Sequence, residues 1–364
     1  MIFEAFARRL RGRDSWRREQ EHVAQLVVER PQDTIAFAGV LDLELERRGY
    51  DLAVSAVRSS LLDLVCALVH DDATHLAVHL ASQPGFPHPE APGARDERSR
   101  GAMQVAGTRP ASQIWQVLAD TDGLRTRDPE FGLLLLHELV VRAEPMPVAA
   151  RWFVEWSIET GHPLAQLPTQ LLPIEAGLPA WLPRFGPAAG VRPLPFPDPP
   201  PVVPVALGDV LNGLGAALPV DRVRIGATFG AWIEHSNGRV EIAAHAPGTT
   251  FPYGSPPRLH RLLTVAKISP ATAVEALFSA AGAGGASASG PGGAHARLRT
   301  WQAIAGIVGH DGPVVVDRLS SAAEGTRWVR AEPDDPWFDN VAWDLWLIGA
   351  TGERIVVVAA TDTD

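Results

Sequence analysis

The sequence predicts an α+β protein in two parts, a helical N-terminal domain and an α+β domain with a mostly antiparallel sheet. Three observations support this prediction. Apolar residues recur at helical spacing through the first half of the chain, and the second half alternates as strands do. A proline-rich stretch separates the two halves. With 364 residues, 46% of them hydrophobic, the chain is long enough to bury a core in each part.

The N-terminal domain, residues 1–186, is predicted to be entirely helical. Residues 51–69 are apolar on nearly every side, which is typical of a helix buried between neighbours. Short breaks with Gly, Pro or Asp separate many of the predicted helices, so we expect stacked helical hairpins, although no fixed repeat length is present. Further helices are expected near residues 15–29, 72–82, 110–119, 129–143 and 148–160.

A proline-rich linker is predicted over residues 187–204, which contain eight prolines. Proline fixes φ and lacks an amide donor, so such a segment is an extended, semi-rigid spacer. We place the domain boundary there. Residues 205–364 then form the α+β domain.

Two hairpins are expected in the second domain. Residues 231–244 alternate around Asn237-Gly238, a strong hairpin signal because both central positions of such a turn need positive φ. Residues 343–360 predict the second hairpin, turning between Gly349 and Gly352. Residues 313–317 and 326–332 supply two more candidate strands.

Two helices are expected between these strands. Ser269 followed by Pro270 predicts the start of the first, because serine caps a helix and proline suits its first position. The second is expected from about Ala294 to Val308, ending at Gly309.

Charge and composition exclude several classes of function. The formal net charge of −10 argues against general nucleic-acid binding. The chain shows no run of about 18 apolar residues and no signal-peptide pattern, so we expect a cytoplasmic protein with no membrane partner. Cys66 is the only cysteine, which excludes an internal disulfide, and its apolar surroundings predict a structural thiol.

The C-terminal part of the chain resembles a known family. The segments GGAHARLRTW, residues 292–301, and VAWDLWLIGATGERIVVVAATDTD, residues 341–364, are similar to a family of uncharacterised proteins from high-GC bacteria. The resemblance covers about the last 90 residues and implies no catalytic roles, because that family has no assigned activity.

A glycine-rich stretch is the first candidate site. Six glycines lie between Gly282 and Gly293, with no lysine of the phosphate-loop type after them and no strand before them. We expect a plain flexible loop. The alternative is an anion-binding loop, because free amides at the start of the next helix attract anions. Its ligand-binding residues would be Gly284, Gly285, Gly292, Gly293, His295 and Arg297.

Aspartates and tryptophans gather in residues 332–346, the second candidate site. Asp344 lies between tryptophans inside a predicted strand, where a carboxylate is costly unless it is paired. Indole rings beside carboxylates are typical of sugar sites, and two carboxylates can work as acid and base. In this interpretation Asp344 is catalytic or anchors the substrate, and Asp339 and Trp343 contact the ligand.

Two histidine patterns raise the question of a metal. His75 and His79 are four residues apart, a spacing that can hold zinc if His70, Asp71 or Asp72 supplies a third ligand. An exposed or hydrogen-bonded helix edge is the interpretation we favour, so no metal site is predicted. His137-Glu138 lacks the second histidine of the zinc-protease motif, because position 141 is Val141.

The sequence therefore favours a cytoplasmic binding or interaction protein. Its helical domain would bind a protein partner. Its second domain would hold a pocket for a small anionic ligand or a second partner surface, and no nucleic acid, membrane or cofactor is expected. The alternative is an enzyme of the second domain that acts on an anionic or sugar-like substrate. The sequence leaves open whether the protein is an enzyme at all.

Overall fold

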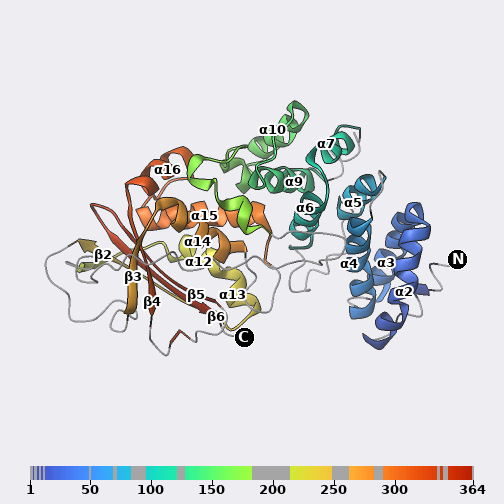
Figure 1. Ribbon diagram of the computed structural model, residues 1–364, viewed down its shortest axis with the longest axis horizontal. Coiled ribbons are helices and arrows are strands. Elements are labelled where there is room, and N and C mark those ends of the chain that lie inside the picture. Colours follow the sequence, from blue (N-terminus) through green and yellow to red (C-terminus); the bar gives the residue numbers. More distant parts are fainter. Residues whose placement is uncertain are drawn as a thin grey trace. The chain divides into compact units, whose positions relative to one another are not determined.

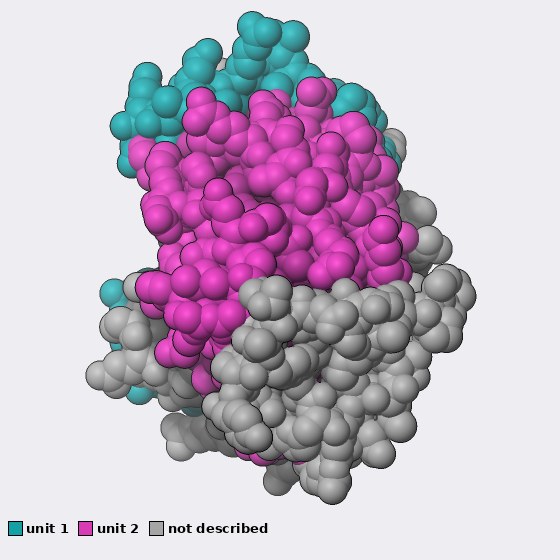
Figure 2. Space-filling view, turned by 90° about the vertical axis from the view of Figure 1, so that its left-hand side faces the viewer, with its two compact units in different colours: residues 1–139, 144–160, 183–192 teal, residues 140–143, 161–182, 193–364 magenta. Residues whose placement is uncertain are grey.

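The computed structural model describes residues 3, 6–7, 10, 13–48, 51–68, 72–82, 96–120, 128–182, 214–247, 262–282, 290–333, 337–338 and 343–362. The chain divides into two compact units (Figures 1 and 2). Unit 1 comprises Met1–Leu139, Glu144–Thr160 and Pro183–Arg192, and unit 2 comprises Val140–Ala143, Gly161–Leu182 and Pro193–Asp364.

Unit 1 is helical throughout its described residues. Consecutive helices pack on one another, and α4 contacts α2, α3, α5 and α6, so its apolar surface is covered as expected. Asp51 starts α4 by accepting hydrogen bonds from the amides of Ala53 and Val54, at 2.9 and 3.2 Å. The elements are α2 (Arg13–Glu29), η1 (Pro31–Asp33), α3 (Thr34–Arg48), α4 (Leu52–Ala67), α5 (Ala73–Ser82), α6 (Asp96–Thr108), α7 (Ala111–Asp120), α9 (Pro129–Val141, whose last two residues belong to unit 2), η2 (Val148–Ala150) and α10 (Arg151–Glu159).

Unit 2 is built on a six-stranded antiparallel sheet with the order β1-β2-β6-β5-β4-β3. This confirms the predicted α+β fold class. The strands are β1 (Leu214–Leu218), β2 (Arg239–Pro247), β3 (Leu262–Ile268), β4 (Arg327–Pro333), β5 (Trp343–Ala350) and β6 (Ile355–Asp362). The other elements are η3 (Pro163–Gln166), η4 (Pro173–Glu175), η5 (Leu178–Trp181), α12 (Arg222–Gly226), η6 (Ala227–Phe229), α13 (Gly230–His235), α14 (Pro270–Gly282), α15 (Gly293–Val308) and α16 (Val316–Gly325).

The two faces of this sheet differ in what packs on them. Gly349 and Trp343 lie on the face that meets the helices. A Cβ on Gly349 would stand 2.4 Å from Ile307 of α15, and the Trp343 ring is 6.3 Å from that of Trp232 in α13. We call this the helix face. Because side chains alternate along a strand, Asp344 points to the opposite side, which we call the Asp344 face.

Several predicted elements are confirmed. The β5–β6 hairpin pairs from Trp343 opposite Asp362 to Ala350 opposite Ile355. Ser269 caps α14 by accepting a hydrogen bond from the amide of Thr272 at 3.0 Å. Gly309 ends α15 in the left-handed region at φ 79°.

The predicted hairpin around Asn237-Gly238 is wrong, because its first arm is the helix α13. Phe229 and Trp232 are fully buried three residues apart, which is helical spacing. Gly238 is needed there for close approach: a Cβ on it would lie 2.6 Å from Trp232, to whose carbonyl the Gly238 amide donates at 3.0 Å.

The predicted strand at residues 313–317 is also wrong, because α16 begins at Val316. Val316, Leu319 and Ala323 are buried at intervals of three and four residues, so helical packing overrides the strand preference of consecutive valines. The sequence did not predict α6, α12, β1 or β3.

The predicted linker, residues 187–204, lies outside the described residues, and the domain boundary stays a prediction. The compact units assign Gly161–Leu182 to unit 2. This segment packs there through η3 on α15 and through η4 and η5 on α14.

Candidate functional site

Three polar residues lie side by side across adjacent strands at one end of the sheet in unit 2. Thr361 of β6 is paired with Arg239 of β2 on one side and with Asp344 of β5 on the other. Directly opposed residues point to the same face, and neighbouring strands are about 4.8 Å apart. Arg239 is exposed, Asp344 is half-buried and Thr361 is fully buried. The buried Thr361 therefore lies between two side chains that are at least partly exposed on the Asp344 face.

Aromatic side chains adjoin this row. Trp346, two residues after Asp344, is buried on the same face. Trp337 and Phe338 pack with it in one apolar cluster, and their rings meet edge to face at 4.7 Å. The Arg239 guanidinium lies 5.3 Å from the centre of the Trp337 ring, and Nη2 of Arg239 donates to the Trp337 carbonyl oxygen at 3.1 Å. Cation, carboxylate and indoles thus meet at one end of the sheet.

Two buried polar atoms of this site lack a hydrogen bond. The Thr361 hydroxyl and the Trp346 indole N–H have no partner within the part of the chain that the structure describes, although their residues are only 0% and 1% exposed. Leaving such a group unpaired costs about 1–3 kcal/mol. Native proteins pair the great majority of buried polar groups, so each exception needs a cause.

Charge at the site is mixed. Glu241 of β2 is half-buried on the Asp344 face, where it pairs with Ala359 of β6, which in turn pairs with Trp346. Arg239 contributes one positive charge, and Glu241 and Asp344 contribute two negative charges. The site can accept hydrogen bonds at its carboxylates and donate them from the indole, the hydroxyl and the guanidinium.

Trp343, predicted to contact the ligand together with Asp344, does not lie beside it on the same face of the sheet. Trp343 lies on the helix face beside Trp232, so the sheet separates its ring from the Asp344 carboxylate. Asp339 lies outside the described residues. Sequence reasoning missed Arg239 and Thr361 as site residues, because strand register brings them to Asp344. Trp346 lies within the predicted stretch 332–346, two residues after Asp344 on the same strand.

The predicted glycine-loop site is only partly described. Gly284 and Gly285 lie outside the described residues. Gly292 is the N-cap of α15 with φ 85°, a conformation that favours glycine, and both it and Gly293 are buried. His295 is half-buried within the first turn of α15.

Arg297, one of the predicted ligand-binding residues, lies in a buried ion pair with Glu175. Its guanidinium is fully buried and pairs with both carboxylate oxygens of Glu175, at 2.7 Å each. It also donates to the carbonyls of Pro168 and Gln170, at 2.8 and 2.9 Å. Trp301 Nε1 donates to the same carboxylate at 2.7 Å. This buried bidentate pair holds residues 168–175 against α15. An anion could therefore reach Arg297 only by displacing Glu175.

Neither histidine motif forms a metal-binding arrangement with other described residues. The rings of His75 and His79 are parallel within 11° and 6.2 Å apart. Asp72 is exposed before α5, and His70 and Asp71 lie outside the described residues. Within the described ranges, no three His, Cys, Asp or Glu side chains are grouped as a metal would require. His137 and Glu138 are buried in α9.

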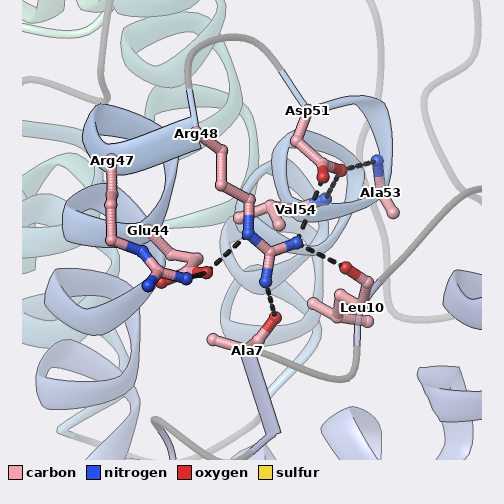
Figure 3. Close-up of polar contacts among 8 residues, drawn as sticks. All are labelled: Ala7, Leu10, Glu44, Arg47, Arg48, Asp51, Ala53 and Val54. Carbon is pink, nitrogen blue, oxygen red and sulfur yellow. Dashed lines mark hydrogen bonds and ion pairs between the residues drawn. The ribbon is translucent and has the colours of Figure 1, made fainter.

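A polar hub joins three segments of unit 1 (Figure 3). The Arg48 guanidinium, at the end of α3, donates to Glu44, to the cap residue Asp51 and to the carbonyls of Ala7 and Leu10. Partial burial acts to raise the pKa of Glu44, but hydrogen bonds from Arg47 and Arg48 outweigh it, so this pKa lies below its ordinary value. The hub is structural, because every group in it is directed at the protein.

Unit 1 also contains a shallow groove of about 680 Å³. Within it, Gln25 Nε2 donates to Glu29 Oε1 at 2.7 Å. Its walls are both polar and apolar, and most of their residues come from α2 and the residues after it. The lining residues are Phe3, His22, Gln25, Leu26, Glu29, Arg30 and Asp33.

Comparison with known proteins gives a family and no function. No curated protein and no solved structure matches the chain significantly. Nor does any helix in the described ranges have the length and apolar character needed to cross a membrane. The model of a family of unknown function, DUF6183, matches residues 20–364, far more than the C-terminal part that the sequence resemblance covered. The chain is therefore a member of the family of unknown function DUF6183.

Proposed function

We propose that this protein binds a small polar ligand at the end of its C-terminal sheet, on the Asp344 face. The sheet-end site consists of Arg239, Thr361, Asp344, Trp346 and Trp337. The observation that carries the proposal is the pair of buried, unbonded polar atoms, the Thr361 hydroxyl and the Trp346 indole N–H, beside two charged side chains.

A purely structural role explains these atoms poorly. Valine would fill the space of Thr361, and phenylalanine would keep an aromatic ring in place of Trp346, both without an unpaired polar atom. A ligand that accepts a hydrogen bond from the indole would recover the cost of its burial. Arg239 and Asp344, at the two partly exposed ends of the same row, would orient that ligand.

The alternative function is an enzyme that works at the same site. The observation that favours it is the register, which brings two carboxylates, Asp344 and Glu241, to one face. A pair of carboxylates is what acid–base hydrolysis of a glycoside uses. Release of nitrophenol from a panel of nitrophenyl glycosides, abolished by Asp344→Asn, would support hydrolysis, and no release by the wild type would contradict it.

Binding is tested by ligand-observed NMR on the full chain. The panel contains monosaccharides, polyols, sugar phosphates, nucleosides and amino acids. We expect at least one class to bind the wild type and to lose binding in Thr361→Val and in Trp346→Phe.

Two matched variants control for general damage. Thr300→Val removes a buried hydroxyl that donates to the Ala296 carbonyl at 2.8 Å, and Trp328→Phe removes an indole N–H that donates to the Ala323 carbonyl at 2.8 Å. Both should retain the ligand when circular dichroism shows that they are folded. The proposal is overturned if no panel member binds, or if binding is indifferent to Thr361 and Trp346.

A further inference from the structure

We infer that the ligand of the sheet-end site is elongated and reaches along the Asp344 face to His245, an inference that rests on the proposed function. Its chemical class is an apolar chain with a polar group at each end. Two observations support this inference. A third buried side chain has unpaired polar atoms, and an apolar surface separates that side chain from Trp346.

His245 of β2 is the third such side chain. It is only 7% exposed, and neither ring nitrogen has a hydrogen-bond partner in the part of the chain that the structure describes. A neutral imidazole has one nitrogen that donates and one that accepts, so both capacities are unused whichever nitrogen carries the proton. The burial of such a ring needs a cause, as it does for Thr361 and Trp346.

Strand register places His245 on the same face of the sheet as those two residues. It pairs with Ile355 of β6 and follows Glu241 by four residues, so its side chain lies on the Asp344 face. The unpaired groups of His245, Trp346 and Thr361 therefore share one face of the sheet.

The distance and the surface between the two polar ends define the shape of the ligand. Four residues along a strand span about 13 Å, which separates His245 from the row that holds Trp346. Between them, Ile355, Val357 and Ala359 of β6 lie on this face, and all three are buried in one apolar cluster. The middle part of the ligand would therefore be apolar and enclosed against these side chains.

The two ends of the ligand have different hydrogen-bonding requirements. The Trp346 indole N–H can only donate, so the ligand must offer it an acceptor. The His245 ring donates at one nitrogen and accepts at the other, so the far end of the ligand can carry a hydroxyl or an amide. A hydroxyl at each end meets both requirements, and linear α,ω-diols are therefore the simplest probes.

The test compares diols with primary alcohols of the same length on the full chain, by ligand-observed NMR. The diols run from 1,6-hexanediol to 1,12-dodecanediol, and each alcohol lacks only the second hydroxyl. We expect a diol of matching length to bind the wild type more tightly than its alcohol, because the second hydroxyl pairs with His245. A simple apolar cavity would give the opposite order, because burying an unpaired hydroxyl is unfavourable.

Variants of His245 locate the second contact. His245→Phe should weaken binding of the matching diol by up to about tenfold, the effect of one hydrogen bond, and leave binding of the alcohol unchanged. His310→Phe is the control, because the His310 ring bonds to the Pro313 carbonyl at 3.0 Å, and it should change neither affinity. The nitrogen NMR resonances of the His245 ring should shift when the diol is added and stay in place with the alcohol.

Three results decide the inference. Diols that bind no better than their alcohols, or that bind His245→Phe as tightly as the wild type, overturn it. The proposed function survives either result if some ligand still requires Thr361 and Trp346. If no diol, alcohol or member of the first panel depends on these two residues, both proposals fall.

Discussion

At the scale of single residues, two buried hydroxyl groups of unit 2 differ in their hydrogen bonding. The hydroxyls of Thr300 and Thr361 are both almost completely buried. Thr300 donates to the Ala296 carbonyl, whereas Thr361 has no bond to any described residue. Their difference in bonding, and not their burial, should decide what each contributes to stability.

Replacing each threonine with valine tests this. Thr300→Val should lower the free energy of unfolding by about 0.5–1.5 kcal/mol, the net contribution of a typical hydrogen bond. Thr361→Val should leave it unchanged or raise it, because an unpaired buried hydroxyl is removed without a change of shape. Urea unfolding monitored by tryptophan fluorescence measures both. Equal losses in the two variants would show that Thr361 is bonded in solution.

Disrupting the buried pair of Arg297 and Glu175 should lower the free energy of unfolding by a larger amount than Thr300→Val does. Arg297→Ala leaves the Glu175 carboxylate fully buried without its cation, which should cost about 3–5 kcal/mol of stability. Arg318→Ala is the control, because Arg318 is exposed on α16 and should change stability by less than about 0.5 kcal/mol. Similar unfolding midpoints for these two variants would contradict the structural role of Arg297.

At the scale of elements, helix ends and one hairpin were predictable, and the pairing of the other strands was not. Ser269 and Gly309 mark their helix ends by local chemistry, a side-chain cap and a left-handed residue, which a sequence displays directly. The segment before Gly238 looked like a strand because it alternates over a few residues. The burial of Phe229 and Trp232 against neighbours made it helical, and tertiary burial is not local information.

The candidate site shows the same limit. Asp344 could be singled out as a carboxylate between tryptophans in a strand. Its partner Arg239 comes from β2, whose register against β6 no local signal specifies, whereas Thr361 lies one residue beyond the predicted hairpin of residues 343–360. Whether a buried atom is bonded depends on that register and on the packing around it. The unpaired state of Thr361 and Trp346 therefore could not be predicted from the sequence.

The hub at the end of α3 makes stability depend on pH. The pKa of Glu44 is lowered in the folded protein, so ionised Glu44 stabilises the fold above its unfolded pKa of about 4.3. This contribution is lost as the pH falls through the folded pKa. Glu44→Gln should therefore be less stable than the wild type at neutral pH, and the gap should close in acid.

Comparing Glu44→Gln with the wild type isolates that effect. Burial raises the pKa values of Asp42 and Asp128, which favours the folded state at low pH. This effect opposes the trend from Glu44 and is present in both the wild type and the variant, so the wild type measured by itself would not show the contribution of Glu44. The difference in melting temperature between variant and wild type, followed from neutral to acid pH, removes these shared terms. A difference that does not change with pH would contradict the role of the ionised carboxylate.

At the scale of the whole molecule, the question is where the second folding unit begins. The proline-rich stretch places the boundary at residues 187–204, and from this the fragment 205–364 is predicted to fold alone. The contacts of Arg297 favour a longer unit, because Glu175 and the carbonyls of Pro168 and Gln170 all precede that stretch. Trp181 Nε1 also donates to Glu275 of α14, at 3.3 Å.

Expressing two fragments decides between these boundaries. Residues 161–364 contain both partners of the buried pair and should give a dispersed NMR spectrum with a cooperative urea transition. Residues 205–364 leave Arg297 in an apolar interior without its carboxylate, and we expect this fragment to be poorly dispersed or much less stable. Adding Arg297→Met to the shorter fragment should recover part of its stability, because a buried unpaired charge is replaced by an apolar side chain of similar length. If the unmodified shorter fragment unfolds at the same urea concentration as the longer one, the segment 161–182 is dispensable and the boundary lies in the proline-rich stretch.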